Sequence, residues 1–72
     1  MNELSSYTVV VSSSPHKIAA APNTIIVENT FDGAMHLRGL KIQRVVLHKM
    51  NKHDLHDKIL ESLEHITHWS FI

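Results

Sequence analysis

The residues best spaced for chemistry in this chain are two pairs of histidines, His53 with His56 and His65 with His68. The members of each pair are three residues apart, so on a helix they share one face, where imidazoles can chelate a divalent metal. Along a continuous helix the two pairs stand about 18 Å apart, which is too far for one ion. No third protein ligand is evident for either pair. We therefore interpret them as surface histidines and expect neither a metal nor a cofactor.

A run of three serines, Ser12 to Ser14, lies close to His16 and invites a search for nucleophilic catalysis. No glycines surround the serines as they do in a nucleophile elbow, and the acids of the chain are scattered singly. Gly33 and Gly39 are the two glycines of the chain, so it has no glycine-rich phosphate loop. We interpret the serines as turn residues and expect a protein that is not an enzyme.

The segment 36–53 is basic, and it contains no acidic residue. It holds five of the seven Lys and Arg residues of the chain: Arg38, Lys41, Arg44, Lys49 and Lys52. The formal net charge of the chain is zero, so the acidic residues lie elsewhere in the sequence and the charge is unevenly distributed. Such a strip can steer a protein partner, or it can follow a phosphate backbone. The run lacks the aromatic residues on which unpaired bases stack, which favours the protein partner over nucleic acid.

Three strands are expected to carry these groups, near 7–12, 24–30 and 35–48. The first two are rich in β-branched residues and end in turn residues. Asp32-Gly33 is the dipeptide typical of a two-residue hairpin turn, so it predicts that the second and third strands are antiparallel. A change in the apolar alternation places a bulge around Gly39. Residues 35–50 also fit a helix, and the sequence leaves that alternative open.

One amphipathic helix is expected near 52–69. Asn51 and Asp54 form an approximate capping box at its start. The apolar positions then recur at helical spacing: Leu55, Ile59, Leu63 and Ile66, with Leu60 beside them. Trp69, Phe71 and Ile72 follow as large apolar groups that must pack on the sheet or on a partner.

Together these elements predict an α+β fold, a single domain over 1–72 in which the helix packs on a three-stranded antiparallel sheet in the order β-β-β-α. A chain of 72 residues without cysteine has a small core and no disulfide to strengthen it. A homodimer that shares apolar surface is the natural remedy. The apolar runs are too short to span a membrane, and the absence of cysteine is compatible with the cytoplasm, where we expect the protein.

These expectations define a protein-binding module that modulates a larger protein, as an accessory regulator or inhibitor does. The basic residues Arg38, Lys41, Arg44, Lys49 and Lys52 would orient the partner, while Trp69 and Phe71 would anchor it. The alternative function is a nucleic-acid-binding regulator that uses the basic 36–53 segment. The two hypotheses differ in whether nucleic acid binds and whether salt weakens that binding.

Overall fold

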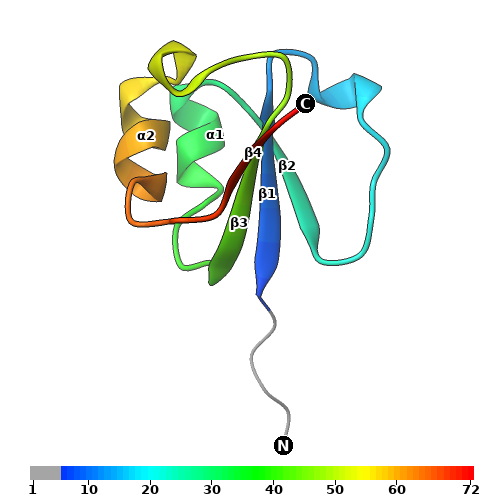
Figure 1. The fold of residues 1–72 in the computed structure, drawn as a ribbon, viewed down its shortest axis with the longest axis horizontal. Coiled ribbons are helices and arrows are strands. Elements are labelled where there is room, and N and C mark those ends of the chain that lie inside the picture. Colours follow the sequence, from blue (N-terminus) through cyan, green and yellow to red (C-terminus); the bar gives the residue numbers. More distant parts are fainter. Residues whose placement is uncertain (1–5) are drawn as a thin grey trace, which may run out of the picture.

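The computed structural model describes residues 6–72, and its elements form a sheet with two α-helices (Figure 1). In chain order the elements of this part of the chain are β1 Tyr7–Ser12, the 3-10 turn η1 Pro15–Lys17, β2 Thr24–Glu28, α1 Phe31–Met35, β3 Ile42–Leu47, the 3-10 turn η2 Lys52–Asp54, α2 Asp57–Leu63 and β4 Trp69–Phe71.

The sheet has four parallel strands in the order β2-β1-β3-β4. The predicted antiparallel sheet of three strands with one helix is therefore wrong. Every connection is a crossover that returns the chain to the same end of the sheet, and α1 and α2 supply the second and third crossovers. Val9, Val10 and Val11 are all buried, which is typical of a central parallel strand covered on both faces.

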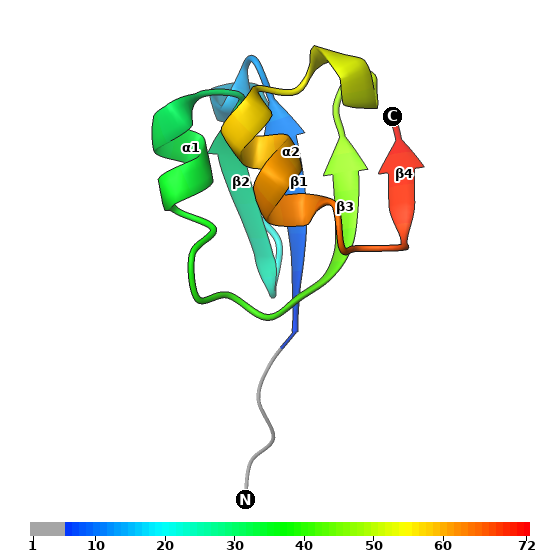
Figure 2. The same cartoon turned by 90° about the vertical axis from the view of Figure 1, so that its left-hand side faces the viewer.

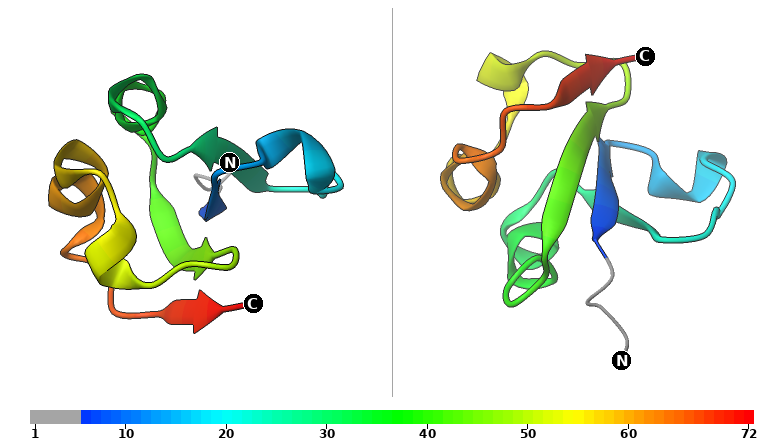
Figure 3. Two further views of the ribbon diagram at one scale, coloured as in Figure 1. Left: turned by 90° about the horizontal axis from the view of Figure 1, so that it is seen from above. Right: turned by 60° about the horizontal axis from the view of Figure 1, so that its bottom comes forward.

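The crossovers place three segments on two faces of the sheet. Helices α1 and α2 cover one face together, whereas the chain around η1 lies on the other face beside β2 (Figures 1 and 2). The view from above separates these layers, with both helices on one side of the sheet and η1 on the other (Figure 3). β4 is an outer strand, and the β4 end of the sheet lies far from η1 (Figure 3).

The core lies between the sheet and the two helices. The sheet contributes Val9, Val11, Val27, Val45 and Leu47, and the helical segments contribute Ala34, Leu37, Leu55, Ile59, Leu63 and Ile66. The predicted apolar stripe of the last segment is thus confirmed as buried. The burial of this stripe holds α2 against the sheet, because the removal of apolar area from water is the main favourable term in folding.

Asp32-Gly33 lies inside α1 and makes no hairpin turn. Thr30 is the N-cap of this helix, and its hydroxyl oxygen accepts a hydrogen bond from the Gly33 amide at 3.1 Å. This cap gives the Gly33 amide a hydrogen-bond acceptor, which the first amides of a helix lack within the helix itself. The predicted pairing of the second and third strands is lost with the hairpin, and β2 and β3 are separated by β1.

The predicted strand over 35–48 is shorter in the structure, where β3 spans only Ile42–Leu47. Met35 ends α1, so the helix alternative for 35–50 describes only the first residue of that range. Gly39 has a φ of +80° in the connection that follows α1, and no bulge lies there. The register of β1 against β3 shifts beside Gln43 instead, since Tyr7 pairs with Ile42 and Thr8 with Arg44.

The predicted helix over 52–69 is three elements, of which only Asp57–Leu63 is α-helical. The capping interaction exists, because the Asn51 amide donates to the Asp54 carboxylate at 2.9 Å, but it closes a single 3-10 turn. Asn29 holds the break that follows. Its side chain donates to the Asp54 carbonyl at 2.9 Å and accepts from the His56 amide at 2.8 Å. The side-chain amide of Asn29, which is distant in sequence, thus pairs with backbone groups that a continuous helix would pair within itself.

Candidate interaction surface

The five cations of the basic segment lie on different parts of the molecule, and all are exposed. Arg38 borders a groove between α1 and α2. Arg44 precedes the inward-facing Val45 on β3, so it points to the face without helices. Lys41 precedes β3, whereas Lys49 and Lys52 follow it. Lys41 therefore lies at the opposite end of β3 from Lys49 and Lys52. The five basic residues do not form one continuous strip.

Two of the predicted binding residues do come together. The Lys52 ammonium lies over the Trp69 ring, 4.2 Å from its centroid, in a cation–π contact. The Trp69 indole donates a hydrogen bond to the Ile66 carbonyl at 2.6 Å, which fixes the ring beside the core. Lys52 and Trp69 are far apart in the sequence, and only the parallel pairing of β4 with β3 makes them neighbours.

The outer edge of β4 presents free backbone groups. His68 accepts from the Val45 amide at 2.9 Å, and Ile72 exchanges bonds with Leu47 and Lys49 at 3.0 and 2.8 Å. Alternate residues of a strand direct their amide and carbonyl groups to opposite sides. The backbone groups of Trp69 and Phe71 therefore point away from β3, to the open edge of the sheet.

Large apolar side chains accompany this edge. Phe71 is 54% exposed and Ile72 is 68% exposed, whereas Trp69 is half-buried against the core. Trp69 and Phe71 pair with Val45 and Leu47, so both lie on the helix-covered face of the sheet. We name Lys52, Trp69, Phe71 and Ile72 the β4 edge surface. It combines an apolar anchor, a cation and unpaired backbone groups, which are features of a protein-binding edge.

The structure also forms a serine–histidine pair that the sequence did not indicate. The Ser12 hydroxyl and Nδ1 of His48 are 2.9 Å apart at the carboxyl ends of β1 and β3. The chain leaves these two strands toward opposite sides of the sheet, which is where parallel sheets usually bind ligands. However, Ser12 is fully buried, and its oxygen already accepts a hydrogen bond from the Ser14 amide at 2.9 Å. The pair therefore braces the turn after β1.

Replacing Ser12 by alanine is expected to lower the free energy of unfolding by about 1–3 kcal/mol, because the Ser14 amide and His48 each lose a buried partner. Urea unfolding at one fixed protein concentration measures the change. The exposed neighbour Ser13 is the matched control, and its replacement by alanine should change stability by less than about 0.5 kcal/mol. Equal midpoints for the two variants would contradict a bracing role for Ser12.

The four histidines considered as metal ligands do not share a helix face. His53 lies in η2 and His65 follows α2, while His68 borders a polar hollow beside Gln43 and Arg44. His56 is the N-cap of α2, where its Nδ1 accepts from the Lys58 amide at 3.1 Å. Within residues 6–72 no three His, Asp or Glu side chains gather in a group suited to a metal ion.

Comparisons of the chain with protein-family models, with curated proteins and with solved structures gave no match. Neither helix of the described segment has the length and apolar character to cross a bilayer.

Proposed function

We propose that this protein is a small, non-enzymatic protein-binding module of the cytoplasm. It forms a homodimer through the β4 edge surface, and it binds and modulates a larger protein, as an accessory regulator or inhibitor does. The observation that carries this proposal is the open edge of β4, which has exposed Phe71 and Ile72 beside backbone groups directed to solvent. An uncovered strand edge of this kind is a template for pairing with another chain.

The edge is complementary to a second copy of itself. In antiparallel pairing about a two-fold axis at Ser70, Trp69 of one copy stands opposite Phe71 of the other, and their outward backbone groups exchange hydrogen bonds. Trp69 and Phe71 lie on the same face of the sheet, so each pairing also brings two aromatic rings together. Such cross-strand aromatic pairs contribute about 0.5–1.5 kcal/mol each beyond the burial of their area. The dimer would then contain one continuous sheet.

The arrangement of the cations favours this function over a nucleic-acid regulator. Arg38 lies on the helix side of the sheet and Arg44 on the opposite face, so a phosphate backbone cannot follow both in one groove. Lys52 is engaged with Trp69. The part of the chain that the structure describes offers no gathered basic track to support the alternative.

Light-scattering mass after size exclusion tests the dimer, and twice the chain mass of 8.2 kDa is expected. Phe71→Lys places charge on the edge and removes both aromatic pairs, so it should weaken dimerisation at least about tenfold. Met35→Lys is the matched control, because Met35 is similarly exposed on α1, and it should leave the mass unchanged. A monomeric wild-type chain, or an unaltered Phe71→Lys dimer, would refute pairing through β4.

The same experiment, repeated at low salt with a mixed DNA and RNA oligonucleotide pool, separates the two functions. The proposed module should elute at the same position with and without the pool. Co-elution that disappears as salt is raised would instead favour the nucleic-acid regulator.

A further inference from the structure

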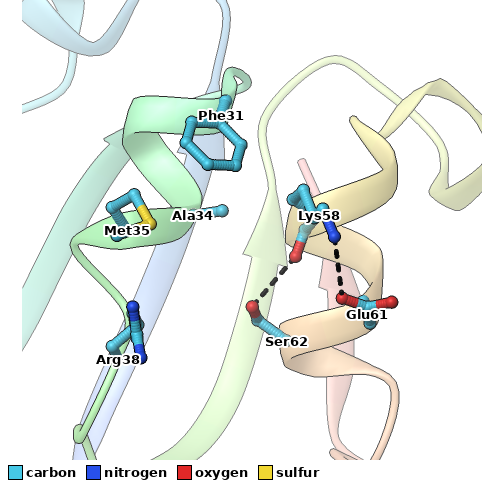
Figure 4. Close-up of a pocket in the computed structure, with 7 residues that line it drawn as sticks. All are labelled: Phe31, Ala34, Met35, Arg38, Lys58, Glu61 and Ser62. Carbon is cyan, nitrogen blue, oxygen red and sulfur yellow. Dashed lines mark hydrogen bonds and ion pairs between the residues drawn. The ribbon is translucent and has the colours of Figure 1, made fainter.

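A groove of about 330 Å³ lies between α1 and α2, on the opposite side of the helices from the sheet core (Figure 4). The bank formed by α1 and the turn after it carries Phe31, Met35 and Arg38, with buried Ala34 at the base. The α2 bank carries Lys58 and Glu61. The volume is similar to that of small ligand pockets.

The α1 bank is apolar and poorly covered. Phe31 is 51% exposed and Met35 is 44% exposed, so two of the four exposed large apolar side chains of the described residues line this one groove. Figure 4 shows both side chains on α1, from which Ala34 points toward α2. The rings of Phe31 and His56 meet in an edge-type arrangement, with centroids 6.4 Å apart. An apolar bank beside charged residues is typical of an interaction surface.

The charges of the groove favour an acidic occupant. Arg38 closes one end of the α1 bank, and among residues 6–72 no carboxylate lies within ion-pair distance of it. Lys58 approaches Glu61 at 3.6 Å, but both side chains are more than half exposed, so water weakens this pair. A carboxylate from a partner can therefore bind Arg38 without displacing an existing partner, and it can compete with Glu61 for Lys58.

We propose that the α1–α2 groove is the docking site for an acidic amphipathic helix of the larger partner. A large apolar side chain of that helix packs against Phe31 and Met35, and carboxylates on its flanks reach Arg38 and Lys58. Recognition of an amphipathic helix by an apolar groove is a common mode of peptide binding. This inference rests on the proposed protein-binding function, to which it adds the docking site and the chemistry of the partner.

Fluorescence anisotropy with a labelled probe peptide tests the groove on the full chain. The probe is a helical 16-residue peptide with Leu and Phe at positions i and i+4 and glutamates on its flanks, and the comparison peptide has lysines in place of the glutamates. The acidic probe should bind, and the lysine peptide should bind at least about tenfold more weakly. Failure of the acidic probe to bind at about 1 mM, or equal affinity for both peptides, would overturn the proposal.

Substitutions test whether the acidic probe binds in the groove. Arg38→Glu and Met35→Glu should each weaken binding of the acidic probe at least about tenfold, and Arg38→Lys should keep most of it, since it retains the positive charge. Phe71→Lys should leave probe binding unchanged, because that residue lies on β4. The loss of dimer mass in Phe71→Lys tests the proposed function, whereas the loss of probe binding in Met35→Glu tests the groove, so the two failures are distinguishable. An unchanged affinity in Arg38→Glu would refute this docking site.

Discussion

Replacing Gly33 by alanine is expected to lower the free energy of unfolding by at least about 3 kcal/mol, a large part of the total of about 4–10 kcal/mol for a chain of this size. A Cβ at this position would collide with the backbone carbonyl oxygen of Glu28 and lie 3.0 Å from its carbon. These are backbone atoms at the end of β2, and the same oxygen accepts the Thr30 amide at 2.8 Å. Helix α1 would have to move away from the sheet.

Helix propensity alone predicts the opposite sign. Glycine inside a helix costs about 0.5–1 kcal/mol relative to alanine, so the substitution would be stabilising if α1 were free of the sheet. Gly39→Ala is the matched control, because Gly39 has no atom within 4 Å of an added Cβ and suffers only from its positive φ. It should cost about 1–2 kcal/mol. A Gly33→Ala protein as stable as the wild type in thermal and urea unfolding would contradict the close approach of α1 to β2.

Replacing Ile59 by alanine is expected to cost about 2–5 kcal/mol, because its side chain is fully buried between α2 and the sheet and its removal leaves a cavity. Urea unfolding monitored by far-ultraviolet circular dichroism measures the change at fixed protein concentration. Leu60 is the adjacent residue and is only half-buried, so Leu60→Ala should cost less than half as much.

The comparison of Ile59 with Leu60 tests the orientation of α2. If α2 were rotated or detached from the sheet, the two substitutions would have similar effects on the unfolding midpoint. Such a result would remove the support for the α1–α2 groove as well, since its Lys58 bank depends on the same orientation.

The direction of the strands was the largest difference between expectation and structure. Asp32-Gly33 predicted a hairpin because the dipeptide suits positive φ angles, but Gly33 has a helical backbone and is required by the approach of Glu28. The continuous apolar run Val9–Val11 was the signal of a strand buried on both faces, and it is more typical of parallel than of antiparallel sheets. Strand direction depends on the path of the connections, which local pattern does not determine.

The last third of the chain shows why helix limits were difficult to predict. The spacing of Leu55, Ile59 and Leu63 correctly marks one buried face, but periodicity does not show where the helix is interrupted. The interruption depends on Asn29, whose amide bonds to Asp54 and His56 across more than twenty residues of sequence. No property of residues 52–69 alone indicates this contact.

The candidate surfaces were partly accessible from the sequence. Phe71 is a large apolar residue near others of its kind, which indicates a contact surface, and the structure exposes it on an outer strand. The basic residues are neighbours in sequence, but β3 separates them in space. The sequence does not indicate Phe31 and Met35 as binding residues, because it predicts a hairpin turn at Asp32-Gly33 and a strand over 35–48. Their spacing of four residues is the signal that would have placed them on one helix face.

The amino-acid sequence is enough to identify which residues are apolar enough to enter a core, where the first two strands lie, and that glycine-rich nucleotide-binding loops and disulfides are absent. These properties depend on side-chain chemistry and on short-range periodicity. Four other features arise from long-range packing: the parallel order of the strands, the interruption of the last helix, the contact of Lys52 with Trp69 and the groove between α1 and α2. Each of these depends on contacts between residues far apart in the chain, which form only when the crossovers bury the helices against one face of the sheet.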